Sequence, residues 1–552
     1  MKSHHFSPIG ALLCLAAGTL SSVASTVAAQ NNSPTAKTAN GTYQGAYLPG
    51  WKQDVFLGMP YAQPPVGPLR WRWPQSTNSS FDGVRDASKY GYSCPQYGTN
   101  FTLSEDCLTI NVVRPSKNAS GEVLVWIYGG GLYAGSTADP QYNLSGIVKV
   151  SQDINQPIIA VSMNYRLGLW GFLQSAQIQA EGSSNAGLID QRLALQWIQE
   201  NIAAFGGDPR RVIIWGESAG AQSVAYQMFA YGGRDDKLFA GAILESGGPQ
   251  GAQIESLSWY NVANENLTRS VGCWGQKDQL ACLRGVDQAT LLAARQSVVW
   301  NPLLDGDFLQ GYPSQLIKED KFVKVPIITG ANTDETFAIA GAANTEQDIF
   351  NSLLAWRSYS LTPPTIRKLL ELYPDDPCQE PPYAITNCTR PPSRGSQWRR
   401  AAAIGSDLVM TSGRRKMAEL LTKAGQKVWS YRFDQRIWNG PEWDGVKHFQ
   451  NVAFSFQNTS GLLGPSPQYD SHARLARAIG TAYVRFARDL DPNGKARGPQ
   501  SAELLPEWPV YRLHSPRNIV LNATKSWVED DTWRRAGIAY INSPEISKEL
   551  LG

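Results

Sequence analysis

The feature that most constrains this chain is Ser218, the centre of the sequence Gly216-Glu217-Ser218-Ala219-Gly220. Apolar residues 212–215 (VIIW) directly precede this sequence and predict a short buried strand, and residues 222–228 after it are compatible with a helix. Glycines two positions before and two positions after Ser218 permit a turn that is too tight for larger side chains. The pattern predicts a sharp strand-to-helix turn that holds the Ser218 hydroxyl clear of the backbone.

Apolar runs and helical segments alternate along the rest of the chain. Further strands are expected at residues 123–128, 158–162, 242–244, 325–329 and 428–433, and further helices at residues 190–202 and 473–488. This alternation predicts an α/β protein with a large, mostly parallel central sheet flanked by helices. Together with the turn at Ser218, it is typical of the α/β-hydrolase fold, in which reactive groups collect at the carboxyl ends of the strands.

The N-terminus has the pattern of a secretory signal over residues 1–29. Lys2 precedes an apolar core at residues 9–20, and Val27-Ala28-Ala29 precede Gln30. Residues 30–40 are polar and are expected to form a flexible leader. The remaining residues, 41–552, contain no linker, repeat or low-complexity block, so we expect one large domain. The apolar core is too short for a stop-transfer helix, and no later segment resembles a membrane span or lipid-anchor signal, which predicts a soluble exported protein.

The charge balance gives no argument for a polyanionic partner. Removal of residues 1–29 takes away one lysine and no acid, so the formal net charge falls from +3 to +2. That value is too small to argue for nucleic acid or for an anionic membrane as a partner. The sequence does not determine the oligomeric state.

Six cysteines remain once Cys14 leaves with the signal, and they form three close pairs. The pairs are Cys94/Cys107, Cys273/Cys282 and Cys378/Cys388. Six cysteines allow fifteen connectivities, and sequential pairing is the economical interpretation because each pair closes a short loop. Export disfavours free thiols, and the absence of Cys-x-x-Cys spacing or a histidine cluster disfavours a metal site. Several glycosylation sequons also support export, among them Asn78, Asn100, Asn118, Asn143, Asn266, Asn387, Asn458 and Asn522.

A serine hydroxyl needs a base, and the base needs a third group to orient it. Outside the signal, the candidate bases are His448, His472 and His514. His448 is favoured because it lies in a loop beyond the expected strand at residues 428–433, and loops beyond strands carry catalytic side chains. His472 resembles a surface residue at a helix start, and His514 a structural residue near the C-terminal strand.

The third group is expected between the serine and the histidine in chain order. Residues 327–335 read as a buried strand followed by a turn that carries two carboxylates, Asp334 and Glu335, and both are candidates. Gly129-Gly130-Gly131 follows another buried strand, so its backbone N–H groups, with that of Ala219, are candidate donors to an oxyanion.

With these residues in place, the chain resembles the type-B carboxylesterase/lipase family, which includes cholinesterases and secreted fungal lipases. The matching blocks occur in the family's order at residues 56–65 (FLGMPYAQPP), 104–108 (SEDCL), 126–131, 164–166 (NYR), 185–197, 205–209 and 216–220. The resemblance implies a Ser218 nucleophile, a His448 base and a Glu335 acid in preference to Asp334. It also implies Gly130, Gly131 and Ala219 as oxyanion donors, and it matches Cys94–Cys107 and Cys273–Cys282 to the family's recurrent disulfides. The pairing of Cys378 with Cys388 rests on spacing only.

The chain departs from the family pattern in three places. Thr336 replaces the usual glycine after the acid, and Asn451 replaces the usual acid three residues after the histidine. The loop between Cys94 and Cys107 has only twelve, mostly polar residues, whereas the lipases of the family close a long amphipathic flap with this disulfide. The same loop has no tryptophan of the kind that binds choline in cholinesterases. These departures predict an open-mouthed esterase.

The sequence thus predicts a secreted serine carboxylesterase that uses an acyl-enzyme intermediate and needs no metal or organic cofactor. Glu217 is expected in a buried polar network, and the acyl pocket near Leu132, Trp170 and residues 298–304. The same chemistry would serve a thioesterase, lactonase or amidase. A non-catalytic binding protein of the neuroligin kind would be expected to lack a triad member and to carry a membrane anchor.

Overall fold

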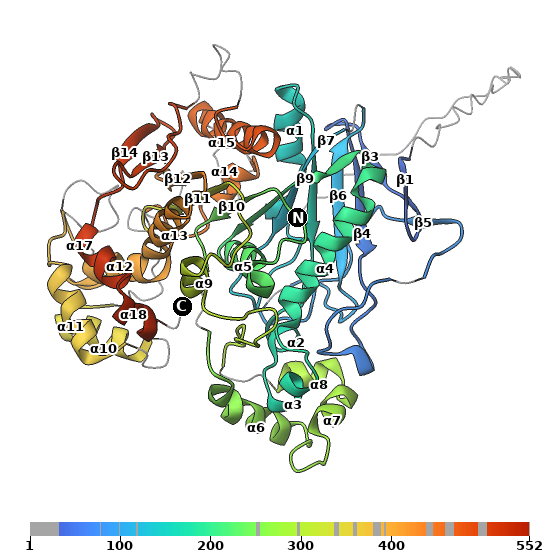
Figure 1. The fold of residues 1–552 in the computed structure, drawn as a ribbon, viewed down its shortest axis with the longest axis horizontal. Coiled ribbons are helices and arrows are strands. Elements are labelled where there is room, and N and C mark those ends of the chain that lie inside the picture. Colours follow the sequence, from blue (N-terminus) through green and yellow to red (C-terminus); the bar gives the residue numbers. More distant parts are fainter. Residues whose placement is uncertain are drawn as a thin grey trace, which may run out of the picture.

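The computed structural model describes residues 33–77, 79–98, 100–117, 120–249, 254–294, 298–335, 342–356, 361–378, 388–390, 393–437, 445–458, 469–494 and 505–550. The proposed signal over residues 1–29 lies outside these residues. Within them, an 11-stranded sheet runs through the molecule, and helices lie on both of its faces (Figure 1).

The centre of the sheet is parallel. In spatial order the parallel strands are β8 (Ile158–Met163), β7 (Gly121–Ile127), β9 (Gly207–Glu217), β10 (Gly241–Glu245), β11 (Ile327–Asn332), β12 (Val428–Phe433) and β13 (Arg517–Leu521). Antiparallel strands complete both edges: β14 (Trp527–Asp530) beside β13, and β6 (Thr109–Pro115), β4 (Gln53–Pro60) and β3 (Ala46–Leu48) beyond β8. The large, mostly parallel sheet confirms the predicted fold class.

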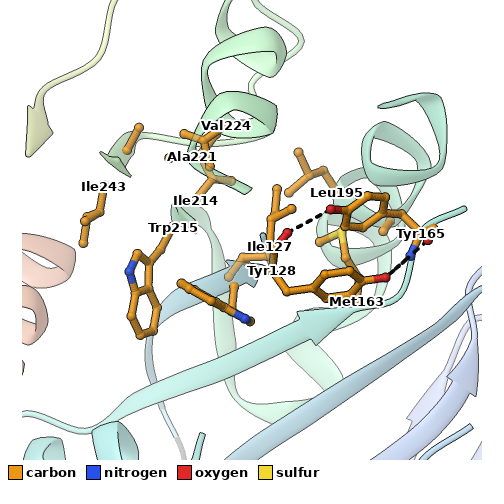
Figure 2. Packing of buried hydrophobic residues seen from close by; sticks show 14 of the residues in the cluster. Ile127, Tyr128, Met163, Tyr165, Leu195, Ile214, Trp215, Ala221, Val224 and Ile243 are labelled. Atoms are coloured by element: carbon orange, nitrogen blue, oxygen red, sulfur yellow. Dashed lines mark hydrogen bonds between the residues drawn. The ribbon is translucent and has the colours of Figure 1, made fainter. Parts of the chain in front are cut away.

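The apolar strands are buried because successive side chains enter two different helical layers. Figure 2 shows Ile214 beside Ala221 and Val224 of helix α5 (Ala219–Gly233). The next residue, Trp215, points the other way and packs edge-on against Tyr483 of helix α15 (Asp470–Asp489). On the α5 side lie α4 (Ala186–Asn201) and α13 (Ser412–Lys423), and on the α15 side lies α1 (Ser145–Asp153).

The other helices lie outside these layers or connect them. They are α2 (Gly168–Phe172), α3 (Ala176–Ala180), α6 (Asn261–Ser270), α7 (Gln279–Gly285), α8 (Gln288–Ala293), α9 (Pro313–Lys318), α10 (Glu346–Ala355), α11 (Pro363–Leu372), α12 (Trp398–Ser406), α14 (Val452–Ser455), α17 (Arg535–Ile541) and α18 (Pro544–Glu549). Helices α10, α11, α12 and α17 share a second hydrophobic cluster apart from the main core. No helix in the described ranges is both long and apolar enough to cross a bilayer.

The structure joins the cysteines in sequence order. Disulfides link Cys94 to Cys107, Cys273 to Cys282 and Cys378 to Cys388. Each bond closes a loop of the kind that the spacing predicts, and the Cys273–Cys282 bond ties α7 to the end of α6.

The expectation of a flexible leader over residues 30–40 is wrong for its second half. Strand β1 (Thr35–Thr38) pairs antiparallel with β2 (Gly41–Gln44), which pairs with β5 (Val84–Asp86) in a small separate sheet. The strand was missed because its sequence, TAKT, is polar. In the structure its alternate residues Ala36 and Thr38 are buried, and the backbone is satisfied by pairing that the sequence does not reveal.

Candidate active site

Ser218 occupies the turn between the end of β9 and the start of α5. Its backbone has φ 56° and ψ −124°, a strained conformation for a residue with a side chain. The Ser218 N–H donates to the Glu245 carbonyl at 2.9 Å, so the neighbouring strand β10 supports the turn. The hydroxyl therefore sits at the carboxyl edge of the sheet, as the sequence predicts.

The glycines around Ser218 are required by close packing. A Cβ atom at Gly216 would lie 2.4 Å from the Gly220 carbonyl carbon, and one at Gly220 would lie 2.1 Å from the Ile127 carbonyl oxygen. Both separations are far below van der Waals contact, and the opposing atoms are backbone atoms that cannot move aside easily. The turn can form only because neither residue has a side chain.

His448 and Glu335 complete a hydrogen-bonded chain with Ser218. The His448 Nε2 atom lies 2.9 Å from Ser218 Oγ, and the His448 Nδ1 atom lies 2.7 Å from Glu335 Oε2. Glu335 is fully buried, whereas the His448 side chain is 31% exposed. These distances suit proton transfer from the hydroxyl to the imidazole, with the carboxylate orienting the ring.

The two loops that carry His448 and Glu335 are joined directly. The His448 N–H donates to the Glu335 carbonyl at 3.1 Å, and the Asp334 N–H donates to the Val446 carbonyl at 3.0 Å. The Asp334 side chain accepts from the Val446 N–H at 2.9 Å. Asp334, the other candidate acid, thus faces the backbone of the histidine loop, and Glu335 faces the ring.

A second buried carboxyl approaches the imidazole from the side of Ser218. Glu217 Oε1 lies 3.3 Å from His448 Nε2 and has no hydrogen-bond partner among the described residues. Burial raises the pKa of Glu217 to about 8, although the charge of His448 opposes this rise. Burial by itself lowers the pKa of His448, but the charges of Glu217 and Glu335 and the Glu335 hydrogen bond outweigh it, so that pKa is raised.

The candidate oxyanion donors lie beside the nucleophile. Gly130 and Gly131 have φ values of 100° and 65°, which favour glycine, and a Cβ atom on Gly129 would lie 3.0 Å from Ser218 Cβ. Among the backbone hydrogen bonds of the described residues, none has the N–H of Gly130, Gly131 or Ala219 as its donor. These three N–H groups therefore remain candidate donors to a negatively charged oxygen at Ser218.

A pair of stacked tyrosines lies between the end of β7 and the glycine loop (residues 129–135). The rings of Tyr128 and Tyr165 lie 4.6 Å apart with an interplanar angle of 20°, and the Tyr165 hydroxyl donates to the Tyr128 carbonyl at 2.8 Å (Figure 2). The Tyr165 N–H approaches the Tyr128 hydroxyl at 3.3 Å. This reciprocal pairing fixes the residue that immediately precedes Gly129.

The short Cys94–Cys107 loop is fastened to the far end of the glycine loop. The buried Gln96 amide donates to the Gly135 carbonyl at 2.8 Å and accepts from the Gly135 N–H at 2.8 Å. Ser93 Oγ and Ser136 Oγ lie 2.7 Å apart in the same contact. The Gln96 contact was not anticipated from the sequence, and its only sequence signal is a single amide two residues after a disulfide cysteine.

The structure places the other histidines away from this chain of groups. His472 is in the first turn of α15 and is buried against Phe454 and Tyr469, so the prediction of a surface residue is wrong. One nitrogen of its buried ring keeps a polar partner, because Gln435 Nε2 lies 3.1 Å from the His472 Nε2 atom. His514 is exposed. Thr336, the departure next to Glu335, lies outside the described residues.

Two of the expected acyl-pocket residues, Leu132 and Trp170, are buried next to the glycine loop. The Leu132 carbonyl accepts from the Gly168 N–H at 2.8 Å, which brings the Trp170 helix α2 to this loop. Within residues 298–304, the third segment expected near the acyl pocket, the ring of Trp300 stacks on that of Tyr260 with a centroid distance of 5.4 Å. The described residues contain no group of three or more histidine, cysteine or acidic side chains placed to hold a metal ion.

Comparison with known proteins gives a consistent result across nearly the whole chain. The model of the carboxylesterase family matches residues 32–534. Lipase 4 of Diutina rugosa is 34% identical, with 91% of this chain and 95% of the lipase covered, and Secreted lipase 1 of Botryotinia fuckeliana (strain B05.10) is 34% identical, with 88% and 89% covered. The crystal structure of Aspergillus niger EstA superposes with a TM-score of 0.82 at 28% identity, covering 94% of this chain and 99% of EstA.

Proposed function

Because this chain belongs to the carboxylesterase family and is a serine carboxylic ester hydrolase, we propose that it is a secreted esterase that acts through an acyl-enzyme intermediate. The observation that carries the proposal is the hydrogen-bonded chain from Ser218 through His448 to the buried Glu335. Its substrate is a small-molecule ester.

In the first half of the reaction, His448 Nε2 removes the hydroxyl proton while Ser218 Oγ attacks the ester carbonyl carbon. The carbonyl oxygen becomes an oxyanion, and the N–H groups of Gly130, Gly131 and Ala219 donate to it. His448 then gives its proton to the leaving alcohol, the carbon–oxygen ester bond breaks, and the acyl group remains on Ser218.

In the second half, His448 takes a proton from a water molecule that attacks the acyl carbon. The new oxyanion is stabilised by the same donors, and the proton returns to Ser218 Oγ as the carboxylic acid leaves. Glu335 stays ionised, orients the ring through Nδ1–H and stabilises the imidazolium in both halves.

We propose that the enzyme behaves as an open-mouthed esterase, although several of its relatives are named lipases. The support is the Cys94–Cys107 loop, in which Gln96 is bonded to Gly135, while Ser93, the residue before the loop, is bonded to Ser136. A loop of this length, fastened at these points, has neither the area nor the freedom of an amphipathic lid.

Export remains part of the proposal. Residues 1–29 would be removed as a signal, and Cys14 with them. The three disulfides and two relatives named as secreted, Secreted lipase 1 of Botryotinia fuckeliana and Secreted triacylglycerol lipase LIP1 of Gibberella zeae, support this placement. The sequons at Asn143 and Asn266 are exposed and are proposed sites of glycosylation.

The test is hydrolysis of p-nitrophenyl esters from acetyl to palmitoyl, below and above their solubility limits, by wild type and Ser218→Ala. We expect a short-chain preference with no rate increase at the solubility limit, and a loss of about 10⁶-fold in kcat for the variant. A fluorophosphonate probe should label wild type at Ser218 and fail to label the variant. Labelling of Ser218→Ala would refute the nucleophile assignment, and a rate jump on emulsions would refute the open-mouthed esterase.

A further inference from the structure

Glu245 is a buried carboxyl that the proposed reaction does not use. It is the last residue of β10, is fully buried, and lies in register with Glu217 on one side and Gly330 on the other. Its backbone carbonyl accepts the hydrogen bond from Ser218 N–H. An acid at the end of an otherwise apolar strand is costly unless its oxygens are occupied, so its partners indicate its role.

Three side chains donate to the Glu245 carboxylate. Ser455 Oγ, at 2.7 Å, and the Tyr483 hydroxyl donate to Oε1, while Asn451 Nδ2 donates to Oε2 at 3.1 Å. Burial raises the pKa of Glu245 to about 7, and the hydrogen bonds from Tyr483 and Ser455 oppose that rise. One carboxylate oxygen thus accepts hydrogen bonds from α14 and α15, and the other accepts one from the amide of Asn451.

From Asn451 the chain of hydrogen bonds continues to both catalytic loops. Asn332 Nδ2 donates to Asn451 Oδ1 at 3.1 Å and to the Lys447 carbonyl at 2.8 Å, directly before His448. The Asn332 N–H donates to Glu335 Oε1 at 2.5 Å. One continuous chain of hydrogen bonds therefore connects Glu245, at the end of β10, with the residues that place His448 and Glu335.

The two ends of this chain of hydrogen bonds fix which groups donate and which accept. The Lys447 carbonyl and an ionised Glu245 can only accept, so the two amides between them must donate outward: Asn332 to Lys447, and Asn451 to Glu245. An acid at position 451 would face Glu245 Oε2 at about 3 Å and repel it. This chain has asparagine where the family it resembles usually has an acid, and it has an acid at position 245.

We infer that Glu245 and Asn451 form a carboxylate–amide pair that positions His448 and Glu335 on Ser218. The inference rests on the proposed function, because positioning has a catalytic consequence only if these three residues act together. Neither residue contacts the reacting atoms, so both are positioning residues. What matters in this pair is that one member is an acid and the other an amide, whichever position carries which.

The test exchanges the two groups. With its oxygen still held by Tyr483 and Ser455, the amide introduced by Glu245→Gln turns its N–H groups against those of Asn451, and Asn451→Asp places two carboxylates against each other. In the double variant Glu245→Gln/Asn451→Asp the hydrogen bonds can all form again. The amide introduced at position 245 keeps its oxygen for Tyr483 and Ser455 and donates through its nitrogen to the carboxylate introduced at position 451, which also accepts from Asn332.

We expect each single variant to lower kcat for p-nitrophenyl butyrate about 10- to 100-fold with KM within about twofold of wild type. The double variant should recover to within about threefold of the wild-type kcat. Rates are referred to the concentration of sites titrated by a fluorophosphonate, so misfolded protein is not counted. Tyr483→Phe is the control, because it removes one donor to Glu245 but leaves Asn451 and Asn332 paired, and its kcat should remain within about threefold of wild type.

The inference is overturned if the double variant is no more active than the poorer single variant, or if both single variants match wild type. A loss in Tyr483→Phe as large as in Glu245→Gln would also overturn it, because the effect would then belong to packing around the carboxylate. If the single variants fail to fold, an active double variant still supports the pairing and an inactive one refutes it. A wild type that neither turns over esters nor is labelled at Ser218 would refute the proposed function instead.

Discussion

At the residue scale, the buried carboxyls around His448 differ in their hydrogen-bond partners. Glu335 faces His448 Nδ1, Asp334 faces the Val446 N–H, and Glu245 faces Asn451. Glu217 differs from these three because its Oε1 atom has no hydrogen-bond partner among the described residues and lies 3.3 Å from His448 Nε2. Its charge therefore acts mainly on the pKa of the proposed base.

This arrangement predicts a shift in the pH profile of Glu217→Gln. Catalysis needs neutral His448, so kcat/KM falls as the pH drops through the raised pKa of that ring. The pKa of His448 is raised to about 9 and that of Glu217 to about 8, so Glu217 is mostly ionised where the ring loses its proton. Glu217→Gln removes this charge, so the acid limb of kcat/KM should move to lower pH by about 1 unit. The measurement is kcat/KM from pH 4 to 10 on a substrate without titratable groups. An acid limb that stays at the wild-type pH, or moves to higher pH, would contradict this account of the site.

At the scale of elements, the glycine loop after β7 is fixed at both ends. The Tyr128–Tyr165 stack precedes it, and Gln96 of the disulfide loop pairs with Gly135 beyond it. Between these points the Gly130 carbonyl accepts from the N–H groups of Tyr133 and Ala134. A turn that is preorganised in this way needs little rearrangement when the oxyanion forms, which is the condition for efficient electrostatic stabilisation.

Gln96→Leu is predicted to damage catalysis more than binding. The substitution leaves the N–H and carbonyl of Gly135 unpaired in a partly buried site, so the glycine loop should relax away from Ser218. We expect kcat to fall about 10-fold, with KM nearly unchanged and the Cys94–Cys107 bond intact by mass spectrometry.

The matched control is Gln63→Leu, the same chemical change at a side chain whose amide donates to the Ser76 carbonyl at the surface. This control should keep wild-type kcat. If Gln96→Leu instead gained activity on emulsified esters, the loop would be a lid that Gln96 keeps closed, contrary to the role assigned to it here.

At the scale of the whole molecule, a buried ion-pair cluster secures the C-terminal part of the chain against the sheet. Asp531, which follows β14, accepts from Arg414 Nη1 at 2.6 Å and Nη2 at 2.9 Å, from Arg415 Nη2 at 2.8 Å and from the Tyr511 hydroxyl at 2.9 Å. Both arginines belong to α13, so the cluster joins that helix to the edge of the sheet. Burial raises the pKa of Asp531, but the charges of Arg414 and Arg415 lower it far more, to well below its usual range.

Asp531→Asn is predicted to destabilise the fold by about 3–5 kcal/mol, because it leaves two buried guanidinium groups without their ion-pair partner. A carboxyl whose pKa is lowered on folding contributes stability that is complete above its unfolded pKa of about 4 and is lost as the pH falls further. The melting temperatures of wild type and variant should therefore differ by a constant amount from neutral pH down to about pH 4, and should converge only gradually as the pH falls further towards the lowered pKa of Asp531 in the folded state.

The neighbouring acid supplies the control for this prediction. Asp530 is 69% exposed and lies 3.5 Å from Arg517, so Asp530→Asn should change stability by no more than about 0.5 kcal/mol. Equal melting temperatures for the two variants at pH 7 would show that the cluster does not stabilise the C-terminal part of the fold.

The sequence by itself determined the local features, because each depends on residues that are close together in the chain. The turn at Ser218 follows from two glycines and an apolar run, and the apolar runs at β7, β8, β10 and β12 fall within two residues of the observed strands. The family resemblance rests on short motifs of the same kind. The scarcity of histidines left few candidate bases, of which His448 is the one that meets Ser218.

Only the tertiary structure decided which distant groups meet. Glu335 and His448 are 113 residues apart, and Asn451 and Glu245 are 206 residues apart. No periodicity or spacing could therefore distinguish Glu335 from Asp334, which the family resemblance alone separated, or assign a partner to Glu245. The burial of His472 and the pairing of the polar strand β1 were missed for the same reason. A local pattern indicates the backbone conformation of a segment and which face of that helix or strand is apolar. The hydrogen bonds and charges at a site depend instead on how separate strands and loops converge.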